Sequence, residues 1–126
     1  MTKTYYEQLS DLNVDFFESA KISLLDPLGL YLANDVKWIK TNQNWNYLKF
    51  PVVIGGKGQP ILLLHGFDSS FLEFRRIYQS LKRNFQVIVP DLLGFGFSPR
   101  CAVNEYNPSK IISYLVDLLK TLKIKD

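Results

Sequence analysis

The stretch that most constrains the fold of this chain covers residues 60–70, Pro-Ile-Leu-Leu-Leu-His-Gly-Phe-Asp-Ser-Ser. Four consecutive large aliphatic residues, 61–64, end abruptly at His65-Gly66. A short apolar run closed by a turn signal is typical of a strand buried on both faces, as in a parallel sheet. A helical pattern follows at once, so residues 65–69 are predicted to form a loop at the carboxyl end of a strand. Ligands gather at such loops in open α/β sheets.

The composition is that of a globular domain. The chain has 126 residues, of which 47% are hydrophobic and 21% are charged, and this length suits one ordinary domain. Its net charge of +3 is spread over 15 basic and 12 acidic residues, which does not favour a nucleic-acid partner. The single cysteine, Cys101, excludes an internal disulfide and fits a reducing compartment. We find no apolar run of about 20 residues that could span a bilayer and no signal-peptide core, so we expect a cytoplasmic protein.

Residues 1–35 are expected to form an N-terminal helical and irregular extension, and residues 36–126 the main domain. Apolar residues at three- and four-residue steps predict a helix over about residues 4–19. The following apolar stretch, 22–33, is broken by Pro27 and Gly29, so we predict an irregular segment that covers the sheet. A surface-binding role for this stretch is the alternative.

The main domain is predicted to begin with two antiparallel strands. Residues 36–54 are rich in β-branched and aromatic side chains, with a turn at 42–44. Pro51 indicates that at least one of these strands lies at or near a sheet edge.

Two strand–helix units follow. The strand at 61–64 leads to a predicted helix over 70–82, with Ser69 or Ser70 as its N-cap. An apolar run at 85–89 stops at Pro90-Asp91, and a second helix begins at Pro108 with Asn107 as N-cap. The order strand, helix, strand, helix predicts an α/β fold whose later strands are parallel, with right-handed crossovers.

The chemistry should lie in the loops that follow the two parallel strands. The first is His65-Gly66-Phe67-Asp68, and the second, residues 91–98, reads Asp-Leu-Leu-Gly-Phe-Gly-Phe-Ser. This ordered pair of loops resembles the α/β-hydrolase fold family, which has a His-Gly-X loop after its third strand and an Asp-X-X-Gly-X-Gly-X-Ser loop after its fourth. The resemblance covers about residues 36–126 and is strongest to esterase- and epoxide-hydrolase-like members of bacterial type.

The resemblance implies a role for the first loop. In this family, one backbone N–H of an oxyanion hole comes from this loop and another from the residue after the nucleophile. Carried across by position, the donor here is the N–H of Phe67. His65 and Gly66 would shape the loop, and His65 would transfer no protons. The competing interpretation is a plain strand–helix turn without a ligand.

The second loop is expected to be structural. Residues 96–100, Gly-Phe-Ser-Pro-Arg, begin like a nucleophile elbow, Gly-X-Ser-X-Gly, but the fifth residue is Arg and Pro99 has no N–H to donate. We therefore expect Asp91, Gly94, Gly96 and Ser98 to shape this loop, with Asp91 accepting hydrogen bonds from backbone amides in its own turn. Cys101 beside Arg100 could be an activated thiolate, although an inert cysteine is the simpler interpretation. We expect no metal and no cofactor.

The family's catalytic triad is missing from these residues. Nucleophile, acid and histidine follow the second crossover helix in the family, whereas the only histidine here is His65. We therefore expect the N-terminal half of an α/β hydrolase, a truncated fragment that stops before the nucleophile strand and is inactive alone. The 61–64 strand should then lie between the 85–89 strand and the missing one.

Two classes of function remain open. The parent protein, or this chain joined to a second polypeptide that supplies the missing half, would hydrolyse a small ester, amide or related substrate. The alternative is a non-catalytic interaction module or the remnant of a truncated gene. A Gly-X-Ser-X-Gly codon run in the downstream DNA would favour the first class.

Overall fold

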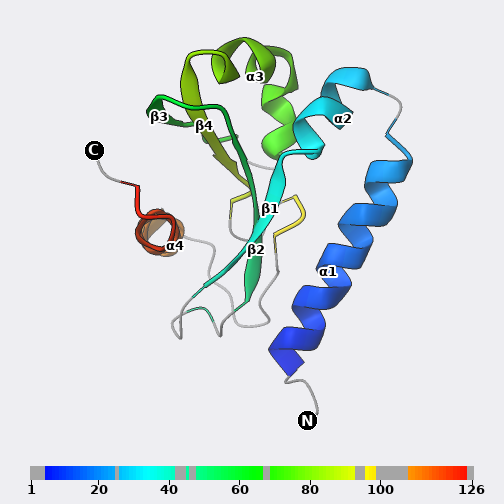
Figure 1. Ribbon diagram of the computed structural model, residues 1–126. Helices are drawn as coiled ribbons and strands as arrows, with labels where there is room; N and C mark the ends of the chain where they lie inside the picture. The colour runs from blue at the N-terminus through cyan, green and yellow to red at the C-terminus, as the bar shows by residue number, and fades with distance from the viewer. Residues whose placement is uncertain are drawn as a thin grey trace.

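The computed structural model describes residues 5–24, 26–41, 45, 48–66, 69–92, 96–98 and 108–124, and shows a sheet flanked by helices (Figure 1). In chain order the elements are α1 (Tyr5–Ile22), α2 (Pro27–Ala33), β1 (Val36–Lys40), β2 (Lys49–Gly55), β3 (Gln59–Leu62), the 3₁₀ helix η2 (Phe71–Phe74), α3 (Arg75–Lys82), β4 (Phe85–Pro90) and α4 (Pro108–Thr121). None of the helices in these ranges is long and apolar enough to cross a membrane.

The sheet has the order β1-β2-β4-β3. β1 pairs antiparallel with β2, and β2 pairs antiparallel with β4. β3 pairs parallel with β4, to which it is joined through η2 and α3. The predicted α/β class, with two leading antiparallel strands followed by parallel strands, is therefore confirmed.

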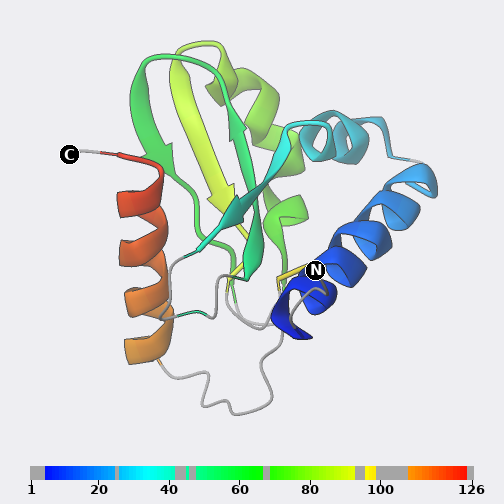
Figure 2. The same ribbon diagram turned by 60° about the horizontal axis from the view of Figure 1, so that its bottom comes forward.

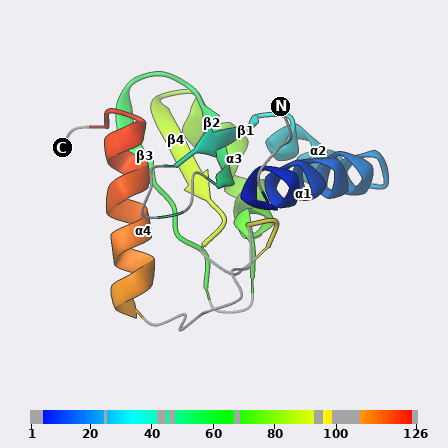
Figure 3. The ribbon, with the colours of Figure 1, turned by 90° about the horizontal axis from the view of Figure 1, so that it is seen from below.

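Helices cover both faces of the sheet, and the sheet separates the hydrophobic core into two parts. Figures 2 and 3 show α4 on one side and α1, α2 and α3 on the other. Successive residues of an inner strand alternate between the two cores: Val52 packs with the α4 side and Val53 with the opposite side. Val87, Ile88 and Val89 alternate in the same way along β4. Both β2 and β4 are therefore buried on two faces, as strands of a covered sheet must be.

β3 is less buried than predicted. The strand covers Gln59–Leu62, two residues earlier than the predicted 61–64, although the Leu63 N–H still donates to the Ile88 carbonyl at 2.9 Å. Leu64 is 45% exposed. The physical reason is position, because β3 is the last strand of the described sheet and has a neighbour on one side only.

The segment 22–33 is not wholly irregular, so that prediction was wrong. Pro27 opens α2, and the Asp26 carboxylate accepts a hydrogen bond from the Leu28 N–H as the N-cap. Proline at the first helical position loses no hydrogen bond, since that N–H would be unpaired in any case. Gly29 is buried inside the helix, so the two residues that suggested a break are both accommodated.

The remaining boundaries agree with the sequence to within a few residues. Ser70 caps η2 by accepting a hydrogen bond from the Leu72 N–H, and α4 begins at Pro108 as predicted. Pro51 lies in the inner strand β2, opposite Trp38 of β1, and β1 is the edge strand. The predicted turn at 42–44 and the predicted cap Asn107 lie outside the described residues.

Candidate functional site

The two loops singled out by the sequence meet at one end of the sheet. β3 and β4 are parallel, so their carboxyl ends lie at the same edge, where ligands bind in open α/β sheets. His65 follows β3, and Asp91 follows β4 directly. Both side chains are completely buried. The site is therefore organised by two polar side chains withdrawn from water, which must be hydrogen-bonded to be stable there.

The His65 ring ties the first loop to the second. The backbone N–H of Leu92 donates to His65 Nε2 at 2.9 Å, and His65 Nδ1 lies 2.8 Å from the Gly66 carbonyl oxygen. A backbone amide can only donate, so Nε2 accepts, and Nδ1 carries the proton that it donates to Gly66. Nδ1 thus bonds to the backbone of the first loop, and Nε2 bonds to the backbone of the second.

Asp91 holds together three segments that are distant in sequence. One carboxylate oxygen accepts from the Phe71 N–H and the other from the Phe97 N–H, each at 2.7 Å. Its carbonyl oxygen accepts from the Ser98 hydroxyl at 2.7 Å and from the Tyr114 hydroxyl at 3.2 Å. Hydrogen bonds from backbone amides to a buried carboxylate are strong. Asp91 therefore fixes the start of η2 and the second loop, and it connects both to α4.

The two described glycines of the loops have opposite surroundings. Gly96 has a φ of +56°, and a Cβ atom added there would collide with the Asp91 carboxylate. Among the described residues, a Cβ at Gly66 would meet no atom within 4 Å. Glycine is thus required at 96 by both backbone conformation and space, whereas position 66 has open room beside it. Gly94, also expected to shape the second loop, lies outside the described residues, as do Phe67 and Cys101.

Sequence reasoning missed a further residue of this site, Glu73 of η2. The Gly66 N–H donates to Glu73 Oε2 at 3.1 Å. Hydrogen bonds from the Ser69 side chain and then from the Gly66 amide lower the pKa of the Glu73 carboxyl. No sequence pattern pointed to it, because Glu73 lies inside the predicted helix 70–82, where a charged side chain is ordinary on the solvent-facing side.

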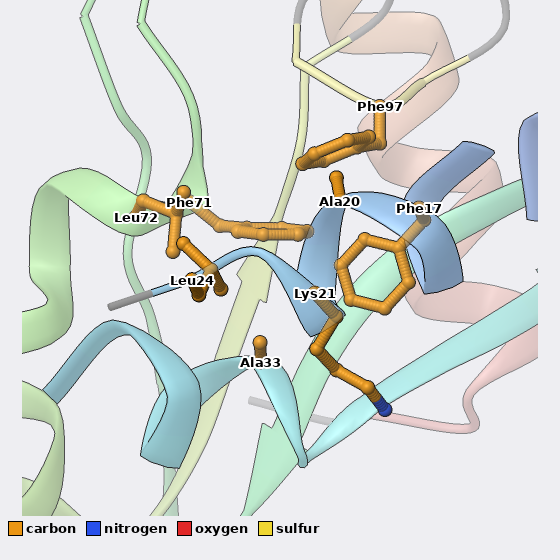
Figure 4. A pocket seen from close by; sticks show the side chains of 8 residues that line it. All are labelled: Phe17, Ala20, Lys21, Leu24, Ala33, Phe71, Leu72 and Phe97. Atoms are coloured by element: carbon orange, nitrogen blue, oxygen red, sulfur yellow. The ribbon is translucent and has the colours of Figure 1, made fainter. Parts of the chain in front are cut away.

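Aromatic side chains form an apolar wall next to the two loops. The Phe71 and Phe97 rings are stacked with their centroids 6.0 Å apart, and Phe17 of α1 meets Phe97 edge-on at 5.0 Å. These rings border a small pocket of about 30 Å³ between α1 and η2 (Figure 4). Because the backbone amides of Phe71 and Phe97 both bind Asp91, the buried carboxylate also sets the spacing of these two rings.

The geometry assigns the polar side chains of the loops to loop structure. The Ser98 hydroxyl donates to the Asp91 carbonyl, and the Nδ1 proton of His65 is directed at Gly66. These donors are used within the loops and are not arranged as a nucleophile with its base, which requires a hydrogen bond between the two. Within the described ranges, no group of three or more His, Cys, Asp or Glu side chains is placed to hold a metal ion.

Known proteins resemble parts of this chain. The family model described as alpha/beta hydrolase fold matches residues 59–126, more than half of the chain. A 2-hydroxymuconate semialdehyde hydrolase from Pseudomonas sp. (strain CF600) is 33% identical over 73 residues, 56% of this chain and 26% of that protein. A soluble epoxide hydrolase from Corynebacterium sp. (strain C12) is 40% identical over 55 residues, 44% of this chain and 19% of that protein.

A solved structure extends the likeness to the fold. The meta-cleavage product hydrolase from Pseudomonas fluorescens IP01 superposes with a TM-score of 0.64 at 26% identity, covering 71% of this chain and 33% of that one. The chain thus spans between about a fifth and a third of the length of these relatives. The matched segment contains β3, η2, α3, β4 and α4, together with both loops of the site. The chain therefore belongs to the α/β-hydrolase fold family.

Proposed function

We propose that this chain carries the oxyanion-loop part of a hydrolase that acts on a small ester, amide or related substrate. The observation that carries the proposal is the hydrogen bond from the Leu92 N–H to the buried His65 ring, which locks the loop after β3 to the loop after β4. Acyl transfer builds negative charge on a carbonyl oxygen, and a preorganised backbone N–H stabilises that charge. A loop locked in this way is suited to present such a donor.

The proposed donor is the N–H of Phe67, assigned by its place in the His-Gly-X loop. Its neighbour Gly66 is held through its carbonyl by His65 and through its N–H by Glu73. The open space beside Gly66 leaves room for a substrate at this edge of the sheet. His65, Gly66, Asp91, Gly94, Gly96 and Ser98 are proposed to shape the two loops around that space.

The nucleophile and its base are proposed to come from sequence outside this chain. The 126 residues contain no Gly-X-Ser-X-Gly run, and the ring nitrogens of the only histidine bind backbone groups. Within the described sheet, the outer edge of β3 has no partner strand. An unpaired edge can accept a further strand, from a continuation of the chain or from a second polypeptide. The single cysteine supports a reducing, cytoplasmic location for the assembly.

The first test asks whether this chain reacts by itself. The purified chain is incubated with a fluorophosphonate probe and with p-nitrophenyl acetate, and we expect neither labelling nor turnover. The DNA downstream is then read for a Gly-X-Ser-X-Gly codon run in any frame, and the encoded segment is produced together with this chain. Labelling at that serine supports the proposal. Labelling at Ser69, Ser70 or Ser98 of this chain would contradict it, and the absence of a downstream elbow would favour a non-catalytic module.

The second test concerns the donor in the active assembly. Phe67→Pro removes the N–H and should reduce turnover about a hundredfold or more, with little change in substrate binding. Phe67→Ala is the matched control, because it removes the ring and keeps the N–H. Circular dichroism of both variants checks that they fold. If a well-folded Phe67→Pro variant retained full turnover, Phe67 would not be the donor.

A further inference from the structure

We propose that Glu73 is a positioning residue, which holds the loop after β3 in the shape needed to present its backbone donor. This inference rests on the proposed function, but its central contact is measurable without any substrate. Glu73 lies on η2, and its carboxylate reaches back to the Gly66 N–H at 3.1 Å. The nearby Ser69 side chain also lowers the pKa of the same carboxyl. Glu73 thus holds the start of the loop through its hydrogen bond to Gly66.

Glu73 is presented from a firmly anchored element. The Ser70 hydroxyl caps η2 by accepting from the Leu72 N–H at 3.2 Å, and the Phe71 N–H donates to the buried Asp91 carboxylate at 2.7 Å. The Phe71 side chain is fully buried. A carboxylate attached to this turn therefore starts from a fixed backbone, and it can transmit that position to Gly66 through a single hydrogen bond.

Gly66 needs such restraints, because neither its own side chain nor packing can supply them. Glycine has the widest conformational range of any residue, and no atom of the residues that the structure describes lies within 4 Å of a Cβ placed at position 66. Its carbonyl is held by His65 Nδ1 at 2.8 Å and its N–H by Glu73. Peptide units are planar, so holding the N–H and the carbonyl of one glycine fixes the planes before and after it. The hydrogen bonds, rather than contacts, determine how the chain leaves β3.

The charge of Glu73 contributes to this role. The Ser69 side chain and the Gly66 amide stabilise the ionised carboxylate, and the pKa of Glu73 is lowered for that reason. Because Glu73 is exposed, its hydrogen bonds should contribute little to the stability of the whole fold. Their loss should therefore appear locally, in the loop.

The experiment follows the Gly66 amide by ¹H–¹⁵N NMR in the full chain. In Glu73→Ala, we expect a changed Gly66 amide shift and a hydrogen-exchange rate about three- to tenfold higher, the effect of one lost hydrogen bond. Glu73→Gln keeps an acceptor oxygen and should restore part of the protection. Glu18→Ala, an exposed glutamate on α1 paired with Lys21, is the matched control and should leave Gly66 unchanged. An unaltered Gly66 amide in Glu73→Ala would overturn the proposal.

In the active assembly, Glu73→Ala should lower kcat about three- to tenfold with little change in KM, and Glu73→Gln should recover part of the loss. Full turnover in Glu73→Ala, despite a released Gly66 amide, would overturn the positioning role. If the wild-type assembly hydrolysed nothing, the proposed function would fail, while the amide measurement would still decide whether Glu73 holds the loop.

Discussion

Two aspartates anchor opposite ends of the sheet, and they do so with different kinds of partner. Asp91, directly after β4, accepts from two backbone amides, those of Phe71 and Phe97. Asp35, directly before β1, accepts from two side chains: the Tyr78 hydroxyl at 2.5 Å and Lys82 Nζ at 2.6 Å. The Asp91 side chain is completely buried, whereas that of Asp35 is 24% exposed.

The kind of partner determines how easily each aspartate can be replaced. Backbone amides keep their positions whatever side chains surround them, so Asp91 fixes the course of the backbone in both segments whose amides it binds. Asp35 joins α3 to the start of β1 through side chains, and water can replace the partly exposed Lys82 ammonium there. The candidate site therefore depends on the Asp91 carboxylate, which no other group can replace. The opposite end of the sheet should tolerate a substitution of Asp35 better.

The largest effect is expected from Asp91→Ala. The substitution leaves one buried N–H group, that of Phe71, and one partly buried N–H group, that of Phe97, without an acceptor, at a cost of about 3–5 kcal/mol in the free energy of unfolding. Asp35→Ala should cost less, roughly 1–3 kcal/mol, because the partly exposed Lys82 ammonium can turn to water, whereas the buried Tyr78 hydroxyl loses its acceptor. Urea denaturation of both variants measures the two values. Asp91→Asn is the control for charge, because it keeps one acceptor oxygen and should fall between Asp91→Ala and the wild type. Equal costs for the two alanine variants would remove the distinction between the ends.

A smaller effect should separate the two glycines of the site. Gly96→Ala places a Cβ against the Asp91 carboxylate at a positive φ, so we expect a loss of about 2–3 kcal/mol from backbone strain and the displaced carboxylate. Gly66→Ala is the matched control: its Cβ enters open space, and the change should stay within about 0.5 kcal/mol. Thermal unfolding of both variants measures the difference. A Gly96→Ala variant as stable as Gly66→Ala would show that Asp91 can yield, contrary to the role assigned to it.

The sequence predicted the sheet better than the contacts of the site. The apolar run at 85–89 located β4, because a strand covered on both faces needs continuous apolar side chains. The run at 61–64 indicated β3, but with a shift of two residues and with more burial than the strand has. Local signals also placed Ser70 and Pro108 at helix starts. They failed for α2, where Pro27 and Gly29 read as a break, although the Asp26 cap was visible in the sequence.

The contacts of the site depend on tertiary packing that no local pattern encodes. The Asp91 carboxylate binds the Phe71 amide 20 residues upstream. Because nearly every residue has a backbone amide, such a hydrogen bond does not require a particular residue type at the donor position. Glu73 was hidden for a related reason. An exposed glutamate in an amphipathic helix looks the same whether its carboxylate faces water or a neighbouring loop.

The last and smallest effect concerns alkaline pH at the Asp35 end. Burial first, and then the hydrogen bond and charge of Asp35, raise the pKa of Tyr78 well above its ordinary value of 10.0. The Asp35 hydrogen bond also raises the pKa of Lys82 above 10.5. Both groups hold their protons more tightly in the folded state than in the unfolded state. Their contribution to stability is therefore complete below about pH 10 and is lost as the pH rises further, because the unfolded state then binds fewer protons.

Tyr78→Phe should cost about 1 kcal/mol at pH 7 by removing one hydrogen bond, and it should make the decline above pH 10 less steep. Tyr114→Phe is the counterpart at the other end, because burial raises the pKa of Tyr114 and its hydroxyl donates to the Asp91 carbonyl at 3.2 Å. Each variant loses one buried tyrosine, but only Tyr78→Phe also removes a partner of the carboxylate that binds Lys82. The urea midpoint is measured for each variant between pH 7 and pH 11. The curve of midpoint against pH should therefore differ more from that of the wild type for Tyr78→Phe than for Tyr114→Phe. Identical pH profiles for the two variants would show that Asp35 and Lys82 add nothing to the alkaline transition.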